Sequence, residues 1–120
     1  MSETIRQWRL ADDQIISLAE DSGLFAPVIL DDEMIKSIQS RDYQAPGQSG
    51  DEIKPDYFID LLDLGGKTMG TAALSSDNVN QLIADDNAQA DDIVMLVSYI
   101  KQQVRDHLGV QLMDNLVYSK

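Results

Sequence analysis

The 120-residue sequence contains no cysteine and a single histidine, His107. The absence of cysteine excludes a disulfide framework and any zinc site built on thiolates. One imidazole leaves a transition-metal site to carboxylates alone, and no helical spacing in the chain brings several of them together. We therefore expect neither a metal nor a disulfide. Zero cysteine is also consistent with a reducing compartment, and we expect a cytoplasmic protein.

Long apolar runs are missing as well. No stretch approaches the roughly 18 apolar residues that a membrane-spanning helix requires. Residues 1–14 lack the apolar centre of a secretory signal peptide. The chain length suits one ordinary domain, so the sequence predicts a single soluble domain with no membrane partner.

Basic residues are scarce: Lys and Arg number 9 against 21 acidic residues, which gives a formal net charge of −12 and a pI near 4.1. Binding to nucleic acid depends on basic side chains that displace counterions from phosphates, so we expect no nucleic-acid partner. An anionic membrane is disfavoured by the same sign of charge. Such acidity is typical of a solubilising surface, although a surface that imitates nucleic acid has the same composition.

Proline is also rare, and two of the three prolines lie within or directly after one polar stretch. Residues 42–54 contain Pro46, Gly47 and Gly50 and show no apolar period, and Pro55 follows them. This composition predicts a mobile loop. The loop divides the domain into an N-terminal portion, residues 1–41, and a C-terminal portion, residues 55–118.

The N-terminal portion is expected to form a helix, a strand and a second helix. Residues 15–19 follow two acidic residues and predict a short helix that stops at Gly23. Residues 25–30 predict a strand. The acidic residues 31–33 suit the start of a second helix, because carboxylates cap and electrostatically favour helix N-termini. A divalent-ion site is the alternative for this acidic cluster, but consecutive helical residues point in different directions.

The C-terminal portion has a clearer pattern. Pro55 suits a first helical position, and the apolar stripe that follows it ends at Gly65 and Gly66. Residues 68–74 predict a strand, and Ser75 can cap the turn that follows. Residues 90–108 predict the longest helix, closed by Gly109 in a left-handed conformation. One face of that helix carries Ile93, Leu96, Val97, Ile100, Val104 and Leu108.

These elements define the fold class. Short helices, short extended segments and one long amphipathic helix indicate an α+β fold, with a small, mostly antiparallel sheet and the helices packed on one face of it.

Four motifs in residues 55–112 occur in an order that resembles a known family. They are Leu64-Gly65-Gly66, then residues 70–75 (GTAALS), then residues 78–81 (NVNQ), then a helix from Ala90-Asp91-Asp92-Ile93 to Leu108-Gly109-Val110-Gln111-Leu112. The arrangement is similar to the C-terminal, substrate-binding domain of UDP-N-acetylenolpyruvoylglucosamine reductase, a flavin enzyme of peptidoglycan precursor synthesis. About half of the chain carries the resemblance.

Departures from the family pattern decide what the resemblance implies for catalysis. The family's general acid is a Glu three residues beyond the final Leu, and Asn115 occupies that position here. The family's histidine aligns with Asn78. The flavin-binding portion of the family precedes this domain and needs more chain than the 54 residues before Pro55. A flavin reduction requires the cofactor and a protein acid, and we expect this chain to supply neither.

The leading interpretation is a free-standing, catalytically inactive relative that uses no cofactor and acts by binding a protein partner or a UDP-sugar. If a sugar nucleotide binds, the candidate ligand residues are those that supply hydrogen-bond donors and acceptors along one strand and its turn: Lys67, Thr71, Ser75, Asn78 and Asn80. The acidic surface opposes a pyrophosphate, which favours a protein partner.

Two alternatives belong to other classes. One is the substrate-domain subunit of a split flavin-dependent reductase in peptidoglycan precursor synthesis. The other is an acidic interaction protein of the nucleic-acid-mimic type. Gly66-Lys67-Thr68 resembles the end of a phosphate-binding loop, but Leu61 stands where that motif needs a glycine, so nucleotide hydrolysis is not expected. The sequence leaves the oligomeric state and the identity of the partner open.

Overall fold

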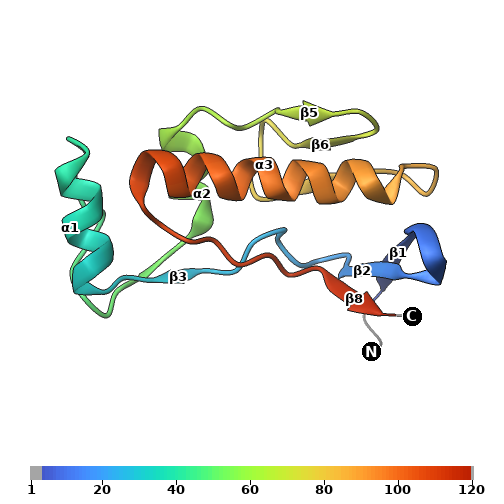
Figure 1. Cartoon of the computed structure of the whole chain (residues 1–120), viewed down its shortest axis with the longest axis horizontal. Coiled ribbons are helices and arrows are strands. Elements are labelled where there is room, and N and C mark those ends of the chain that lie inside the picture. The colour runs from blue at the N-terminus through green and yellow to red at the C-terminus, as the bar shows by residue number, and fades with distance from the viewer. Residues whose placement is uncertain (1–3, 120) are drawn as a thin grey trace.

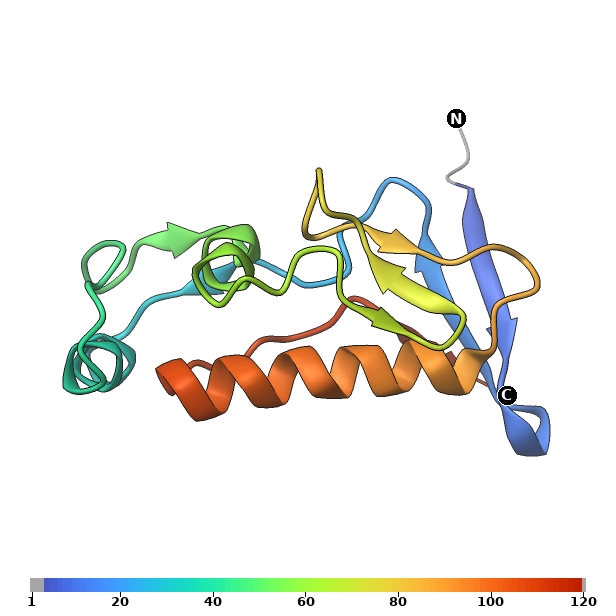
Figure 2. The ribbon, with the colours of Figure 1, turned by 90° about the horizontal axis from the view of Figure 1, so that it is seen from above.

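The computed structural model describes residues 4–119. One long helix, α3 (Ala90–Leu108), lies along one edge of the molecule in Figure 2. Figure 1 shows the strands of residues 68–74 on one side of this helix and the strands nearest the two chain ends on the other. The helix α1 (Asp32–Ser40) lies at one end, opposite the end that carries strands β1 (Ile5–Arg9) and β8 (Val117–Ser119). The remaining helix is α2 (Pro55–Leu61).

The strands form three small antiparallel sheets among the described residues. The first has the order β1-β2-β8, with β2 spanning Ile15–Ala19. The second pairs β3 (Val28–Ile29) with β4 (Glu52–Ile53). The third has the order β5-β6-β7, with bounds Thr68–Met69, Ala72–Leu74 and Leu82–Ile83. The expected α+β class is confirmed, with the expected sheet divided into three.

The core forms around the apolar face of α3. All six residues predicted for that face are buried, at 3% relative exposure or less. They share one hydrophobic cluster with Trp8 and Ile16 of the first sheet and with Phe58 of α2. The N-terminal and C-terminal portions therefore contribute side chains to the same core.

Local sequence signals account for the helix ends. The Asp31 carboxylate accepts a hydrogen bond from the Met34 amide at 2.8 Å, so the predicted cap of α1 is confirmed. Pro55 is the first residue of α2, as predicted. Gly109 closes α3 with φ of 73°, the left-handed conformation that glycine adopts without strain. The Gly109 amide donates to the Arg105 carbonyl at 2.8 Å.

Two predicted elements are wrong. Residues 15–19 form strand β2 rather than a helix, and β2 pairs with β1 so that Ile16 faces Trp8. The acids before it, Asp12 and Asp13, have φ of 62° and 61° and belong to a short 3₁₀ turn (Ala11–Asp13) that connects the strands. The expected helix, strand and helix of residues 1–41 therefore become two paired strands, a third short strand and one helix.

Residues 68–74 are a hairpin rather than one strand. Strand β5 pairs with β6, and Gly70 turns the chain between them with φ of 57°. The stretch 42–54 has no regular structure except β4 at its end. Its mobility stays a prediction. Within residues 4–119, no helix is both long enough and apolar enough to cross a membrane.

Candidate functional site

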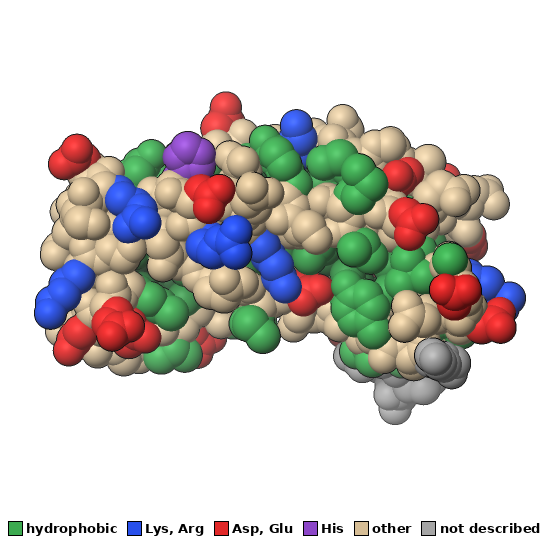
Figure 3. Space-filling model, in the orientation of Figure 1, with side chains coloured by type: hydrophobic (Ala, Val, Ile, Leu, Met, Phe, Trp, Pro, Cys, Tyr) green, Lys and Arg blue, Asp and Glu red, His purple; other side chains and the backbone are tan. Residues whose placement is uncertain are grey.

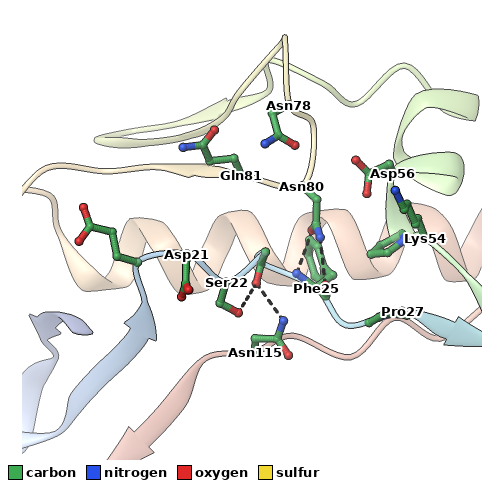
Figure 4. A pocket seen from close by; sticks show the side chains of 13 residues that line it. Asp21, Ser22, Phe25, Pro27, Lys54, Asp56, Asn78, Asn80, Gln81 and Asn115 are labelled. Carbon is green, nitrogen blue, oxygen red and sulfur yellow. Dashed lines mark hydrogen bonds between the residues drawn. The ribbon is translucent and has the colours of Figure 1, made fainter. Parts of the chain in front are cut away.

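A pocket of about 690 Å³ opens where three chain segments converge. Its walls come from residues 20–27 between β2 and β3, from residues 54–56 at the start of α2, and from residues 78–81 before β7. Asn115, which precedes β8, completes the lining. Figure 4 shows these side chains around the opening. The volume lies within the range of pockets that hold small organic ligands.

Asn80 holds two of these segments together. Its side-chain oxygen accepts a hydrogen bond from the Phe25 amide at 2.9 Å, and its Nδ2 donates to the Phe25 carbonyl at 3.0 Å. Its backbone carbonyl accepts from the Leu24 amide at 2.7 Å. One donor and one acceptor of the Asn80 side-chain amide are therefore engaged by the scaffold of the pocket, which fixes the orientation of the group.

Asn115 fixes the same segment from the other side. Its Nδ2 donates to the Gly23 carbonyl at 2.9 Å, and its backbone amide donates to the Leu24 carbonyl at 2.8 Å. Gly23 lies so close to Asn80 that a Cβ added there would overlap the Asn80 Nδ2. Two asparagines thus clamp residues 23–25, one from each side (Figure 4).

Several other polar side chains of the lining have no hydrogen-bond or ion-pair partner among the described residues. Asn78 and Gln81 are exposed, and within residues 4–119 neither side chain forms a hydrogen bond. The ionisable groups are Lys54, Glu20, Asp21 and Asp56. The two ion pairs formed by the described residues are Lys101 with Asp114 and Arg105 with Asp106, so none of the four pocket groups is paired. These side chains can donate to or accept from a ligand.

Of the five ligand candidates chosen from the sequence, the structure brings two into the pocket, Asn78 and Asn80. Lys67 instead places its ammonium 4.6 Å from the centre of the Tyr99 ring, a cation–π contact with α3. The Ser75 hydroxyl accepts from the amides of Asp77 and Asn78, at 3.2 and 3.1 Å, and so closes the turn as predicted.

Thr71 has a structural role at the other end of the hairpin. Its amide and hydroxyl donate to the Asp92 carboxylate at 2.9 and 2.7 Å. Its hydroxyl oxygen accepts from the Gln89 amide at 2.7 Å. The two hydrogen bonds from Thr71, the backbone one first, lower the pKa of Asp92 below its ordinary value. Thr71 therefore ties the β5-β6 turn to the first turn of α3.

Sequence reasoning missed most of the pocket. The run Glu20-Asp21-Ser22-Gly23 has the polar composition of a loop between two apolar segments, which was the available signal. Lys54 stands directly before a helix-starting proline, which fixes its position but does not indicate a partner. Residues 4–119 contain no cluster of His, Asp or Glu side chains arranged to hold a metal ion.

The sequence model of the family described as UDP-N-acetylenolpyruvoylglucosamine reductase, C-terminal domain, matches residues 35–118. This match spans most of the chain, including α2, the β5-β6 hairpin, α3 and most of β8. The chain belongs to this family, as its motifs indicated.

Individual relatives carry the same name. The UDP-N-acetylenolpyruvoylglucosamine reductase of Shigella boydii serotype 4 is 29% identical over 112 residues, which cover 90% of this chain and 32% of that protein. The reductase of Petrotoga mobilis is 32% identical over 78 residues, which cover 62% of this chain and 26% of that protein. That of Fervidobacterium nodosum is 28% identical over 78 residues. The chain spans a third or less of the length of these relatives.

Proposed function

We propose that this domain is a ligand-binding member of the reductase family that does not itself donate the proton of the reduction. The observation that carries the proposal is the position of Asn115. It stands where the resemblance implies a general acid, and its side chain lies in the wall of the pocket. A carboxamide has no proton to give at neutral pH, so the acid step has no donor at this position.

The surroundings of Asn115 are suited to an amide. Its Nδ2 donates to the Gly23 carbonyl at 2.9 Å, and a carbonyl oxygen only accepts hydrogen bonds. A carboxylate at residue 115 would place an acceptor against an acceptor. The Gly23 carbonyl also accepts from the Ser22 hydroxyl at 3.1 Å, so Asn115 supplies the second of its two donors, which a carboxylate could not do.

Binding is supported by the groups that the scaffold leaves free. The amides of Asn78 and Gln81 offer donors and acceptors at the mouth of the pocket, and the rings of Pro27 and Pro55 add apolar surface. The relatives' name refers to a glucosamine derivative. A sugar ring with hydroxyl and acetamido groups matches such a lining in size and hydrogen-bonding character.

The experiment is a titration of ¹⁵N-labelled protein with the fragments of the relatives' named substrate, namely N-acetylglucosamine, UDP and UDP-N-acetylglucosamine. We expect at least one fragment to shift the side-chain amide signals of Asn78 and Gln81. Asn78→Ala and Gln81→Ala should weaken that binding, whereas Gln102→Ala, on the exposed face of α3, should not. No shift with any fragment at tens of millimolar would overturn the proposal.

A second candidate is the subunit of a split reductase, with the flavin-binding portion of such an enzyme as the partner. It is favoured by two observations: the relatives are about three times as long, and Val117 and Tyr118 of β8 are 61% and 50% exposed. Apolar side chains gather at this end of the molecule (Figure 3). We would mix the domain with the flavin-binding portion of the Shigella boydii relative. A stable complex that is lost in Val117→Asp supports this candidate. Reduction of the relatives' enolpyruvyl substrate by the mixture, but not by the flavin-binding portion alone, would contradict the first one.

A further inference from the structure

The balance of charge in the pocket indicates which part of a sugar nucleotide it accepts. We propose that the pocket selects an uncharged sugar bearing hydroxyl and acetamido groups and discriminates against a diphosphate. This inference rests on the proposed function, because it names the ligand class of the same site.

The lining of the pocket carries an excess of negative charge. Glu20, Asp21 and Asp56 contribute three carboxylates, and Lys54 contributes the one ammonium among the lining residues. No ion pair within residues 4–119 neutralises any of them. A diphosphate entering the pocket would therefore meet an excess of negative charge, on a chain whose net charge is −12. A like charge at about 8 Å in a partly solvated site weakens binding roughly three- to tenfold.

The lining offers few of the groups that usually hold a phosphate. Proteins bind phosphate with Arg, Lys or a row of backbone amides at the start of a helix. The lining contains no Arg. The backbone amides of Leu24 and Phe25 already donate to Asn80, and that of Gln81 donates to the Asn78 carbonyl. The amide donors in this part of the wall are thus occupied by the scaffold.

In place of phosphate-binding groups, the lining offers side chains that can form hydrogen bonds with an uncharged sugar. The side chains of Asn78 and Gln81 can each donate and accept, which suits sugar hydroxyls and an acetamido group. The carboxylates of Glu20 and Asp21 accept hydrogen bonds from hydroxyls without a charged partner. Figure 4 shows Asn78 and Gln81 above the opening, Asp21 below it, and Lys54 with Asp56 to one side. An uncharged sugar uses these groups and meets no repulsion.

The dependence of affinity on ionic strength distinguishes charge repulsion from a mismatch between the size or shape of the ligand and the pocket. Repulsion between exposed charges is screened within about 10 Å at 0.1 M salt. Binding of UDP-N-acetylglucosamine should therefore strengthen as salt rises from about 20 to 500 mM, whereas binding of the methyl glycoside of N-acetylglucosamine should stay constant.

The test compares dissociation constants, measured by ¹⁵N chemical-shift titration, for the methyl glycoside, UDP-N-acetylglucosamine and UDP. We expect the glycoside to bind at least as tightly as UDP-N-acetylglucosamine, and UDP alone to bind weakest. The double variant Glu20→Gln/Asp21→Asn should improve the affinity for UDP-N-acetylglucosamine about tenfold or more. Gln and Asn keep an acceptor oxygen for a sugar hydroxyl, so the affinity for the glycoside should fall slightly rather than rise. The control Asp12→Asn/Asp13→Asn makes the same charge change in the β1-β2 turn, outside the pocket.

Three outcomes can be told apart. The inference is supported if the pocket prefers the glycoside and if only Glu20→Gln/Asp21→Asn, and not the control variant, gains affinity for UDP-N-acetylglucosamine. Tighter binding of UDP than of the glycoside overturns it while leaving a ligand-binding pocket intact. If no compound binds at all, both the inference and the proposed function fail.

Discussion

Asn80 and Phe25, 55 positions apart in the chain, are joined by two hydrogen bonds that imitate a pair of β-strands. The Asn80 side-chain oxygen accepts from the Phe25 amide at 2.9 Å, and its Nδ2 donates to the Phe25 carbonyl at 3.0 Å. The Phe25 side chain is 1% exposed and lies in the core. One polar side chain therefore positions both the floor of the pocket and a buried aromatic ring.

Removal of this amide should destabilise the fold. In Asn80→Ala, the amide and carbonyl of Phe25 lose their partners in a part-buried position, and leaving such groups unsatisfied costs about 1–3 kcal/mol. Urea unfolding followed by circular dichroism gives the free energy of unfolding. The matched control is Asn78→Ala, since Asn78 is exposed and its side chain has no hydrogen bond within residues 4–119. Equal losses in the two variants would contradict the structural role of Asn80.

The apolar face of α3 gives a second prediction. Leu96 is 0% exposed, whereas its neighbour Met95 is 53% exposed. Leu96→Ala leaves a cavity among tightly packed side chains and should cost about 2–5 kcal/mol. Met95→Ala should change stability by about 0.5 kcal/mol or less. Urea unfolding of both variants checks the difference, and a loss in Met95→Ala as large as that in Leu96→Ala would place the core on the wrong face of the helix.

These examples show how far the sequence leads. The buried face of α3 was predictable because a period of 3.6 residues records which side of a helix meets the core. The cap at Asp31, the start at Pro55 and the stop at Gly109 were predictable for the same local reason: each signal acts on backbone groups within a few residues of itself.

Elements that depend on distant partners were not predictable. Residues 15–19 become a strand because β1 and β8 pair with them, and Ile16 meets Trp8 across the sheet. Their apolar pattern alone suits a short helix equally well. Asn80 was chosen as a ligand residue for its side-chain chemistry, but its partner is the backbone of Phe25. The pocket joins segments near residues 20, 54, 80 and 115, and only the fold brings them together.

The contact between Thr71 and Asp92 predicts a change at acidic pH. The hydrogen bonds from Thr71 favour the ionised carboxylate, so the pKa of Asp92 lies below its ordinary value of 3.8. A lowered pKa in the folded state adds stability above the unfolded pKa, and this contribution is lost as the pH falls through the folded pKa. NMR titration of the Asp92 carboxyl carbon measures the pKa directly.

The matched variant is Thr71→Val, which keeps the shape of the side chain but lacks the hydroxyl. The pKa of Asp92 should then move up towards 3.8, and the backbone hydrogen bond should keep it from returning fully. The melting temperature should fall more at pH 6 than at pH 2.5, because the variant loses a contact made by the ionised form. An unchanged Asp92 pKa in Thr71→Val would rule out the hydroxyl as a cause.

The strongest test of the pocket wall is an acid at residue 115 itself. In Asn115→Asp, the Gly23 carbonyl keeps the hydrogen bond from the Ser22 hydroxyl but loses the one from residue 115, and the ionised carboxylate places an acceptor against it. We expect a loss of about 1–3 kcal/mol at pH 7.

The protonated acid can donate again, so the introduced group should have a pKa above the usual value of about 3.9. A pKa raised in the folded state means that the loss is absent below the unfolded pKa and develops as the pH rises through the folded one. Urea unfolding at pH 3.5 and pH 7 measures this difference.

The matched control is Asn78→Asp, which adds the same charge at the mouth of the pocket without removing a hydrogen bond, so its free energy of unfolding at pH 7 should fall much less. If Asn115→Asp were as stable as the unaltered protein at pH 7, the Gly23 carbonyl would not need the donor from residue 115, and an acid could be accommodated in this wall after all.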